Sequence, residues 1–430
     1  MKFKTHSIGS LKQCIGQTVG VSGWVHETRD IGKIKFVVLR DSTGMVQVTA
    51  KKGVVSEEVL ASMSLGKEDV VCVVGSVIEM KNAPGGIEVI PEKIELLSKV
   101  ERKLPIDVTE KIMSELDVRL DYRYIDLRRK PVRAMFDIVS MIPQAFREKV
   151  LELGFQEIRP PCIVASSTEG GSNLFPIIYF EREAFLSQSP QLYKQMAVVG
   201  GMEKVFMTTP AFRAEKHNTT FHLNEVLQMD IEMAFADHHD AMDVLSQVAI
   251  HIVKTVASKC AEQLKTLGTV VNANPGIAKI SYDKAVDILR DDFSIEWGAD
   301  FSREHEEALC KLLEKDFVMV YDYPTMVRAF YSMPDETDER KCKAFDLLYK
   351  GTEISSGAQR IHIPEILIAQ LKKRDLNPEN FEYYINAFRY GAPPHAGWSI
   401  GLERFAMKIV GANNIREVVL FPRDRTRLVP

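Results

Sequence analysis

The hydrophobic pattern of the sequence changes near residue 133, and this change constrains the fold more than any other feature. In the first hundred residues, short runs of β-branched and aromatic residues are separated by turn residues. The runs are 19–25, 34–39, 45–49, 70–74 and 87–90. One helical stretch, about 56–63, lies between the third run and the fourth. Five short strands with one helix at that place are typical of a small OB-type barrel, a common platform for single-stranded nucleic acid.

After residue 133 the apolar residues recur with the period of a helix. Between residues 134 and 153 they fall on one helix face, and Gly154 then supplies a C-terminal stop. A second long helix is predicted over 239–264, with strand-like segments between and after the two helices. We therefore predict an α+β protein of three parts. These are an OB-fold domain at 1–100, a charged linker or hinge at 101–133 and a larger domain at 134–430.

The composition is that of a globular protein without a membrane segment. Of the 430 residues, 45% are apolar and 27% are charged, and no run approaches the ~18 apolar residues that a membrane helix needs. The first residues lead into no apolar signal core, so we expect a cytoplasmic protein with no membrane partner. The six cysteines include no CxxC pair, which excludes an obvious zinc ribbon or disulfide framework. The net charge of −4 leaves a nucleic-acid partner open, because an acidic protein can carry a local basic track.

An arginine and a glutamate precede a polar loop in the larger domain. Arg213 and Glu215 come before the loop 216–220, and 225–233 reads as a strand that returns from it. A guanidinium held on a strand beside such a loop suits a phosphate, because its planar fork matches phosphate oxygens. The alternative is a surface ion pair between Arg213 and Glu215, which is a common arrangement on strands.

Two acidic residues and a serine form a second group. Asp346 and Glu353 are seven positions apart, and a turn at Lys350 and Gly351 would bring them together in a hairpin that also carries Ser356. Carboxylates and a hydroxyl are hard oxygen ligands, which suit a Mg²⁺ ion that bridges phosphates. The alternative is a solvated hairpin without a ligand.

A glycine-rich stretch followed by a helix forms the third group. Residues 391–397 are rich in glycine and proline, and Gly401 opens a predicted helix that carries Arg404 and runs through Lys408. Glycines here would let the backbone approach a nucleotide, and the Arg404 guanidinium could stack on its base. The alternative is a glycine-rich loop capped by an exposed arginine.

The order and spacing of these groups resemble the three signature motifs of class II aminoacyl-tRNA synthetases. The segments are Gly154-Phe155 to Pro161, Phe212-Arg213-Ala214-Glu215 and Gly401-Leu402-Glu403-Arg404. With the barrel included, essentially the whole chain resembles the archaeal-type aspartyl-tRNA synthetases. Supporting strings are Thr168-Glu169-Gly170-Gly171, Gln188-Ser189-Pro190-Gln191-Leu192-Tyr193-Lys194, residues 215–220 and Leu420-Phe421-Pro422-Arg423-Asp424.

This resemblance implies a fold, a reaction and partners. The fold is an antiparallel sheet flanked by helices and joined to an OB-fold anticodon-binding domain, in a homodimer whose interface the first motif builds. The reaction is that of an aspartate–tRNA ligase with ATP as substrate and Mg²⁺ as cofactor. The aspartate carboxylate attacks the ATP α-phosphate, and the adenylate then passes its aspartyl group to tRNA. Catalysis of this kind depends on positioning and electrostatic stabilisation.

By match of position, the resemblance assigns the residues of the ATP side. Arg213, Glu215 and Arg404 are the expected catalytic residues, with Arg213 on the α-phosphate and the substrate carboxylate. The ATP-binding set is Arg213, Glu215, Phe221, His222, Leu223, Glu353, Gly401, Leu402, Glu403 and Arg404. The Mg²⁺ ligands are Glu353 and Ser356, with Asp346 nearby. Three positions depart from the family pattern. Val226 stands in place of an aromatic residue, Phe221 in place of an arginine and Ala358 in place of a glycine.

The resemblance also assigns the aspartate side. Glu169 would meet the substrate ammonium, and Lys194 and Arg360 its side-chain carboxylate. The full aspartate-binding set is Glu169, Gln191, Lys194, Arg213, Ser356 and Arg360. A buried cationic pair that faced a neutral amide would be left uncompensated, so such a site favours aspartate over asparagine. Similar asparaginyl enzymes lack the lysine, and lysyl enzymes would need acids at this place.

Five positions in the barrel match those that face the anticodon or set its discrimination in the family. They are His26, Arg29, Phe36, Gln47 and Pro84. Phe36 would stack on a splayed base, while Arg29 and Gln47 would read base edges. The alternatives are a barrel-core role for Phe36 and a turn role for Pro84.

The choice of tRNA rests on two of these positions. The tRNAs for Asp and Asn differ at the last anticodon base, C against U. Similar enzymes strict for tRNA(Asp) tend to carry tryptophan at the place of His26 and lysine at that of Pro84, whereas those that accept both tRNAs carry His and Pro. The sequence therefore favours a non-discriminating enzyme, with an amidotransferase that converts Asp-tRNA(Asn) as its functional partner. The alternatives are an enzyme that charges tRNA(Asp) only and, from another class, a non-catalytic tRNA-binding paralogue.

Overall fold

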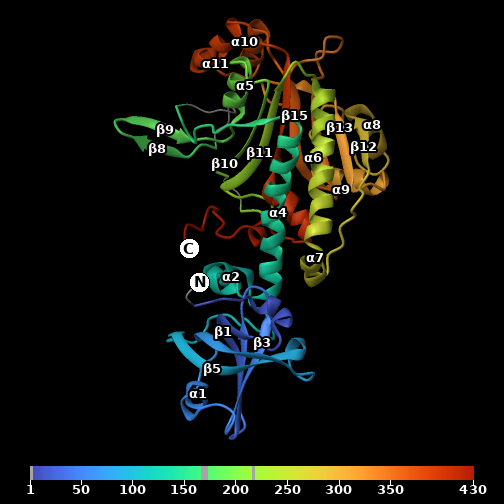
Figure 1. Ribbon diagram of the computed structural model, residues 1–430. Coiled ribbons are helices and arrows are strands. Elements are labelled where there is room, and N and C mark those ends of the chain that lie inside the picture. The colour runs from blue at the N-terminus through green and yellow to red at the C-terminus, as the bar shows by residue number, and fades with distance from the viewer. Residues whose placement is uncertain (1–2, 166–172, 216–217) are drawn as a thin grey trace. The chain divides into compact units, whose positions relative to one another are not determined.

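The computed structural model describes residues 3–165, 173–215 and 218–430. The chain divides into two compact units, Met1–Arg129 and Lys130–Pro430, which can be followed by colour in Figure 1. Most of the segment predicted as a linker, 101–133, lies in the first of these units. Each unit has its own apolar core.

The first unit contains a closed five-stranded barrel, as the sequence predicts. Its strands are β1 (Thr18–Asp30), β2 (Ile34–Arg40), β3 (Met45–Lys51), β4 (Val70–Glu79) and β5 (Ile87–Ser98). They pair in the order β1-β2-β3-β5-β4, and β4 closes the barrel on β1. The short helix α1 (Glu57–Ser62) lies between β3 and β4, and the 3-10 turns η1 (Ile8–Cys14) and η2 (Pro84–Gly86) complete the unit's loops. Alternation along β2 buries Val37 and Leu39 in the barrel core and leaves Phe36 outside it.

The segment after the barrel builds a small core of its own. It carries α2 (Leu116–Asp121) and α3 (Arg123–Asp126). Its apolar cluster is Ile106, Val108 and Ile125. The buried carboxylate of Asp126 accepts hydrogen bonds from Arg119, Arg123 and Arg129. Charge-assisted bonds from three arginines to one buried carboxylate fix the segment to one arrangement.

The second unit is built on an eight-stranded sheet in the order β12-β13-β14-β15-β16-β11-β10-β6. Its strands are β12 (Ile277–Ser281), β13 (Phe317–Tyr321), β14 (Ala344–Tyr349), β15 (Glu353–Arg360), β16 (His395–Gly401), β11 (Glu225–Ala234), β10 (Lys204–Phe212) and β6 (Gln156–Glu157). The six central strands are antiparallel, as predicted, whereas β12 and β6 pair in parallel at the edges. A second sheet joins β7 (Ile163–Val164), β9 (Arg182–Leu186) and β8 (Pro176–Tyr179).

Two long helices cover one face of this sheet. They are α4 (Lys130–Glu152) and α6 (His238–Lys259), which pack against each other in Figure 1. The predicted helix at 134–153 is confirmed, but the one predicted over 239–264 is interrupted at Cys260, after which α7 (Ala261–Leu267) begins. The other helical segments are α5 (Gln191–Val199), α8 (Tyr282–Leu289), α9 (Arg303–Leu312), α10 (Pro364–Lys372), α11 (Glu382–Arg389), α12 (Leu402–Val410), η3 (Thr325–Val327), η4 (Pro378–Phe381) and η5 (Ile415–Val418). Within the described ranges no helix is long and apolar enough to cross a membrane.

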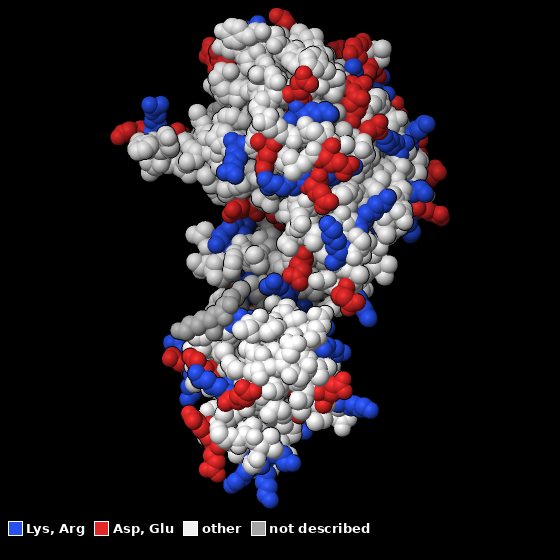
Figure 2. All heavy atoms as spheres, in the orientation of Figure 1, with Lys and Arg blue, Asp and Glu red and all other residues white. Residues whose placement is uncertain are grey.

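The two faces of the central strands differ in polarity. Along β11, Met229, Ile231 and Met233 are buried and alternate with the polar residues Gln228, Asp230 and Glu232. Because neighbours along a strand point to opposite faces, the polar set shares one face. On the exterior of the unit, acidic and basic side chains are interspersed over the face drawn in Figure 2. The polar residues of β11 are buried, unlike the charged residues of the exterior, and the site lies beside them.

Candidate active site

A cavity of about 320 Å³ opens on the polar side of β11, β15 and β16, beside α5 and α12. The predicted residues on its wall are Gln191, Lys194, Arg213, Glu215, Phe221, His222, Leu223, Glu353, Ser356, Arg360, Gly401, Glu403 and Arg404. Val226 also lines the cavity. Leu402 and Asp346 are not part of the wall, and Glu169 lies outside the described residues. The cavity therefore unites segments that are far apart in the chain.

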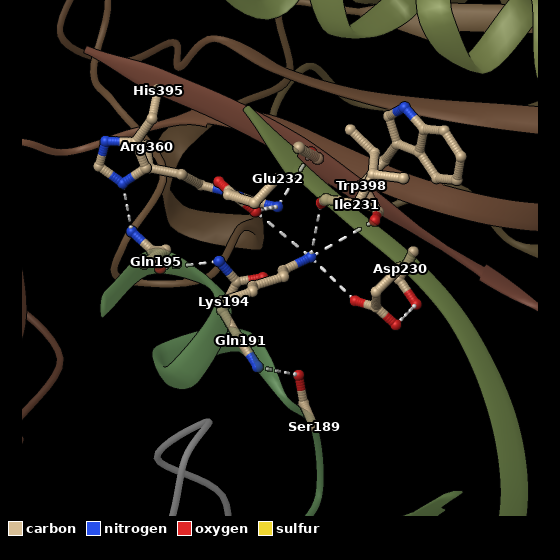
Figure 3. Close-up of polar contacts among 12 residues, drawn as sticks. Ser189, Gln191, Lys194, Gln195, Asp230, Ile231, Glu232, Arg360, His395 and Trp398 are labelled. Carbon is tan, nitrogen blue, oxygen red and sulfur yellow. Dashed lines mark hydrogen bonds and ion pairs between the residues drawn. The ribbon is translucent and has the colours of Figure 1, made fainter. Parts of the chain in front are cut away.

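Lys194 lies at the closed end of the cavity and is fully buried. Its Nζ is 2.8 Å from Asp230 Oδ1 and 3.4 Å from Glu232 Oε2, and it also donates to the carbonyl oxygens of Ile231 and Trp398 (Figure 3). The motifs in the sequence predict a role for the lysine but not for the two acids. Both acids come from the polar face of β11, so the strand sets their spacing.

Arg360 reaches the same acid from β15. Its Nε and Nη2 lie 3.0 and 3.4 Å from the two carboxylate oxygens of Glu232, and Nη2 also donates to the Gly397 carbonyl at 2.9 Å. The Nη1 group has no hydrogen-bond partner among the residues that the structure describes. Burial alone would raise the pKa of Glu232, but the charges of Arg360 and Lys194 outweigh it and hold the pKa below its ordinary value. Glu232 is therefore an ionised link between the two cations.

Gly397 is required by this arrangement. A Cβ at Gly397 would overlap the Glu232 carboxylate and the Ile231 carbonyl. The sequence predicts that the glycines of 391–397 let the backbone approach a nucleotide, and the structure gives Gly397 a separate role. This glycine lies inside β16, and its missing side chain makes room for an acid of the protein.

A chain of neutral hydrogen bonds fixes Gln191. Its amide donates to Gln195 at 2.7 Å, and Gln195 also accepts from the Tyr384 hydroxyl at 2.9 Å. The Gln195 amide donates to His395 Nε2 at 2.9 Å, while His395 Nδ1 donates to the Pro393 carbonyl at 2.8 Å. Burial lowers the pKa of His395, which agrees with a neutral ring that has one donor and one acceptor nitrogen.

Arg213 follows the last residue of β10 and is anchored through its backbone. Its N–H donates to the Asn224 carbonyl at 2.9 Å, and the Asn224 amide donates to the Arg213 carbonyl at 2.7 Å. Over the described ranges its guanidinium forms no ion pair, so the surface pair with Glu215 is not formed there. Arg213 lines the cavity, and no described residue occupies the hydrogen-bonding groups of its guanidinium, which suit an anion.

The β14–β15 hairpin brings the predicted acids together. Lys350 and Gly351 turn the chain at φ values of 48° and 72°, and Asp346 stands opposite Ser356 in the register. A residue that the sequence analysis did not find, Arg328, then pairs with Asp346 through both terminal amino groups. The charge of Asp346 is therefore already balanced within the protein.

Glu353 and Ser356 remain as ligands that fit Mg²⁺. Desolvation and the neighbouring Asp346 raise the pKa of Glu353, so a bound cation would stabilise its ionised form. Among the described residues no three His, Cys, Asp or Glu side chains surround a common point. A partial shell of this kind suits Mg²⁺, which keeps several waters and shares substrate phosphates.

Glu306 of α9 is a further acid that the sequence analysis missed. Its carboxylate accepts the backbone N–H of Glu353 at 2.9 Å. Desolvation, and then the charge of Glu353, raise the pKa of Glu306 to about 8. The charge of Glu353 opposes ionisation of Glu306, so a cation bound near Glu353 would favour the ionised form of both acids.

Arg404 and Gly401 stand at the junction of β16 and α12. Arg404 Nη1 is 3.7 Å from Glu353 Oε2, and Nη2 is 3.5 Å from His222 Nε2. A Cβ at Gly401 would meet no atom within 4 Å, so the space beside it belongs to the cavity. Glu403, predicted to bind ATP, accepts the Leu227 N–H with both oxygens at 3.0 and 3.1 Å, and burial raises its pKa to about 7. Its carboxylate is thus committed to the backbone of β11.

Arg416 of η5 holds the loop that precedes β11. Its Nη1 donates to the Thr219 carbonyl at 2.8 Å, its Nη2 donates to Asn218 and its Nε pairs with Asp424 at 2.6 Å. Thr219 in turn contacts His222 Nδ1 at 2.6 Å. The sequence analysis did not single out Arg416, since it is one of several arginines near the end of the chain.

Comparison with known proteins decides the family. Residues 115–425 match the family model described as tRNA synthetases class II (D, K and N), and residues 19–97 match an OB-fold nucleic acid binding domain. The chain belongs to the class II aminoacyl-tRNA synthetases.

The relatives narrow this to the aspartate–tRNA ligases. The aspartate–tRNA(Asp/Asn) ligase of Methanocaldococcus jannaschii is 48% identical over 100% of this chain and 99% of that protein. The aspartate–tRNA(Asp) ligase of Pyrococcus horikoshii is 47% identical over 100% of both. The asparaginyl-tRNA synthetase of P. horikoshii, solved with asparaginyl-adenylate, matches at a TM-score of 0.94 with 35% identity over 100% of both chains. The chain is thus an aminoacyl-tRNA synthetase that uses ATP and tRNA.

The barrel of the synthetase carries the five positions assigned to the anticodon. Arg29 and Phe36 are partners across β1 and β2, and the Arg29 guanidinium is 5.7 Å from the Phe36 ring centroid. Because Phe36 is absent from the barrel core, the core interpretation is not supported. Gln47 donates to Glu88 Oε2 at 3.0 Å, and Pro84 opens η2. Their contact with tRNA stays a prediction.

His26 has a defined tautomer in the synthetase. Arg40 Nη1 is 2.9 Å from His26 Nδ1, and because a guanidinium only donates, Nδ1 must accept. The pKa of His26 is lowered, first by burial and then by Arg40, so the ring is neutral and carries its proton on Nε2. His26 therefore offers one hydrogen-bond donor and no charge.

Proposed function

We propose that this synthetase is a cytoplasmic aspartate–tRNA ligase that charges both tRNA(Asp) and tRNA(Asn), with Mg²⁺ as cofactor. The observation that carries the choice of amino acid is the pair of buried cations, Lys194 and Arg360, joined by Glu232 at the closed end of the cavity. The substrate's side-chain carboxylate would meet Lys194 and the Nη1 group of Arg360, which has no hydrogen-bond partner among the described residues. The amide nitrogen of asparagine is itself a donor, so opposite these two donor groups it would meet no acceptor, which is a strong basis for discrimination.

The other end of the cavity supports binding of ATP. Arg213 would hold the α-phosphate and the aspartate carboxylate together, and Gly401 leaves room for the nucleotide beside α12. Glu353 and Ser356 would hold a Mg²⁺ ion, which would supply positive charge to the phosphates. Arg404 would place a second guanidinium on the nucleotide, so the residues of this chain act by positioning and charge.

Aspartate activation is tested by exchange of pyrophosphate into ATP. We expect exchange that depends on aspartate and Mg²⁺ and proceeds without tRNA. Exchange with asparagine in place of aspartate, or exchange that requires tRNA, would contradict the proposal.

The breadth of tRNA choice rests on His26 and Pro84. Neither provides a cationic donor for the last anticodon base, and a single good base contact is worth ~1–3 kcal/mol of discrimination. Sequence identity does not separate the two options, because relatives of both kinds are about equally similar, at 48% and 47%. Charging of purified tRNA(Asp) and tRNA(Asn) side by side decides between them. Aspartylation of tRNA(Asp) alone would contradict the proposal and favour an enzyme that charges only that tRNA.

A double substitution tests the assignment of these two residues. His26→Trp with Pro84→Lys is expected to depress charging of tRNA(Asn) more than of tRNA(Asp), because it adds a cationic donor and narrows the space around the base. A ~10-fold change in the ratio of kcat/KM corresponds to ~1.4 kcal/mol, about one base contact. Pyrophosphate exchange without tRNA serves as the control and should stay constant. Equal slowing of both tRNAs would mean that the residues support the barrel only.

Two partners follow from this proposal. A homodimer, with its interface built by the first motif at the end of α4 and through β6, is tested by sedimentation, where a monomer at assay concentration would contradict it.

Charging of tRNA(Asn) with aspartate yields a product whose side-chain carboxyl must be converted to an amide before it serves as Asn-tRNA. An amidotransferase would supply that step, and purified Asp-tRNA(Asn) made by this synthetase would be its substrate.

A further inference from the structure

The ring of Phe221 lines the ATP end of the cavity and carries a cation on its face. The guanidinium of Arg303, from the first turn of α9, lies 4.0 Å from the Phe221 ring centroid. That distance is well inside the range of a cation–π contact. The family pattern has an arginine at position 221, where this chain has Phe221. Arg303 therefore brings a cationic group to a place where the loop itself has none.

The contacts around Phe221 place Arg303 beside the wall of the same cavity, although Arg303 is not itself a lining residue. One turn along α9, Glu306 accepts the N–H of Glu353 at 2.9 Å. Glu353 lies 3.7 Å from Arg404, which lies 3.5 Å from His222, the neighbour of Phe221. The contacts therefore close a ring from α9, through β15 and α12, back to the loop that carries Phe221.

Arg303 keeps hydrogen-bonding capacity on its edge. Its Nε donates to Glu307 at 2.9 Å, and no described residue accepts from its terminal amino groups. The side chain is 54% exposed, so a solute beside Phe221 can reach it. A guanidinium that stacks with its face on a ring can still donate from its edge to phosphate oxygens. Burial, and then the charge of Arg303, lower the pKa of Lys408 on α12, which places a second cation in the same field.

We propose that Arg303 binds the β- or γ-phosphate of ATP and that Phe221 holds its guanidinium in place. The pair supplies the cation that the loop itself lacks at position 221. This inference rests on the use of ATP by the synthetase and not on which tRNA is charged. Phe221 acts as a positioning residue, and Arg303 as a binding residue for the terminal phosphates.

The experiment compares nucleotides that differ only in those phosphates. In Arg303→Ala, we expect the KM for ATP in aspartate-dependent exchange to rise about 10-fold, which is ~1.4 kcal/mol. Inhibition by AMP should be unchanged, because AMP lacks the phosphates that Arg303 contacts. Arg290→Ala is a matched control, since Arg290 is 56% exposed and pairs with Asp287 at 3.2 Å on another helix.

Two further variants separate binding from packing. Arg303→Lys keeps the charge without the planar fork and should recover part of the ATP affinity. Phe221→Arg in the Arg303→Ala background should restore the KM for ATP, because it returns a cation to the loop. An unchanged KM for ATP in Arg303→Ala, or an equal loss of ATP and AMP affinity, would overturn the proposal.

Direct binding keeps this test independent of the proposed function. Equilibrium dialysis of Mg²⁺-ATP and of AMP against the wild type and Arg303→Ala needs no turnover. A wild type without aspartate-dependent exchange would contradict aspartate activation, while a selective loss of ATP binding in the variant would still support Arg303. Equal ATP binding by the wild type and the variant would overturn the role of Arg303 even in an active enzyme.

Discussion

The aspartate end of the cavity balances its charges within the protein, whereas the ATP end does not. Lys194 and Arg360 are buried and both contact Glu232, whose pKa they hold low against the effect of burial. At the other end, desolvation and the charge of Asp346 raise the pKa of Glu353, and desolvation and the charge of Glu353 raise that of Glu306. A network that is complete before the ligand arrives can select by charge and shape. An incomplete network depends on the ligand and its cation to neutralise the charges of the acids.

Exposure follows the same division. The side chain of Lys194 is 0% exposed and that of Arg360 is 5% exposed, while those of Arg404 and Glu353 are 31% and 35% exposed. Buried charges with fixed partners keep one geometry, whereas half-exposed ones can adjust to a nucleotide and its metal. The difference predicts that substitutions at the two ends will affect stability with opposite sign.

The largest effect is expected for Arg360→Leu at the aspartate end. The variant removes a partner from the substrate and from buried Glu232, so we expect a ~1000-fold loss of kcat/KM for aspartate and a loss of about 3–5 kcal/mol in the free energy of unfolding. Exchange assays and chemical denaturation measure the two. Adding Glu232→Gln should recover stability but not activity, and direct ATP binding should persist. An unchanged kcat/KM for aspartate would remove Arg360 from substrate recognition.

Glu353→Ala at the ATP end should lower activity without lowering stability. Pyrophosphate exchange should fall about 100-fold or more, because an electrostatic partner of the phosphates is lost. Without ligand the variant should melt at or above the wild-type temperature, since a carboxylate with a raised pKa opposes folding when it ionises. Normal exchange would place the metal elsewhere, and a marked loss of stability would break the contrast between the two ends.

How much of this division was predictable depends on the residue. The motif pattern identified Lys194, Arg360 and Glu353 because they stand in strings with a family resemblance. Asp230 and Glu232 were missed, although two acids two positions apart on an apolar strand are a detectable signal, since they must share one face.

Other features had no local signal in the sequence. Their contacts are with segments that only the fold brings near, so spacing along the chain does not predict them. The residues are Arg303, Glu306 and Arg328. The barrel and the α4 helix were predictable because their periodicity is regular. The break at Cys260 was not, because the apolar stripe continues through it from α6 into α7.

A pair of glycine substitutions sharpens the comparison at closer range. Gly397→Ala should destabilise the protein by about 1–3 kcal/mol, because its Cβ would overlap the Glu232 carboxylate. Gly401→Ala, with a φ of −76° and open space beside it, should leave the melting temperature unchanged and raise the KM for ATP ~10-fold. Calorimetry and exchange kinetics measure both variants. Equal melting temperatures for the two would argue against the crowding at Gly397.

The remaining prediction concerns the pH dependence of stability in Glu306→Gln. A carboxyl whose pKa rises on folding makes the protein less stable as the pH rises from 4.5 to about 8, because the unfolded chain releases the proton first. Glutamine can still accept the Glu353 N–H but cannot ionise. The melting temperature of the ligand-free variant should therefore exceed that of the wild type by a margin that grows over this interval. A difference in melting temperature that stays constant with pH would show that folding does not raise the pKa of Glu306.

The contacts that close the cavity also determine when it can form. Lys194 reaches the carbonyl of Trp398 across 204 positions, and Arg416 reaches that of Thr219 across 197. Chains emerge from the ribosome N-terminus first, and contacts of such long sequence separation form late in folding. In a nascent chain, Lys194 therefore lacks some of its final contacts until β16 and η5 have been synthesised. Incomplete translation products would lack a working cavity, so the enzyme becomes active only when almost all of the chain has been synthesised.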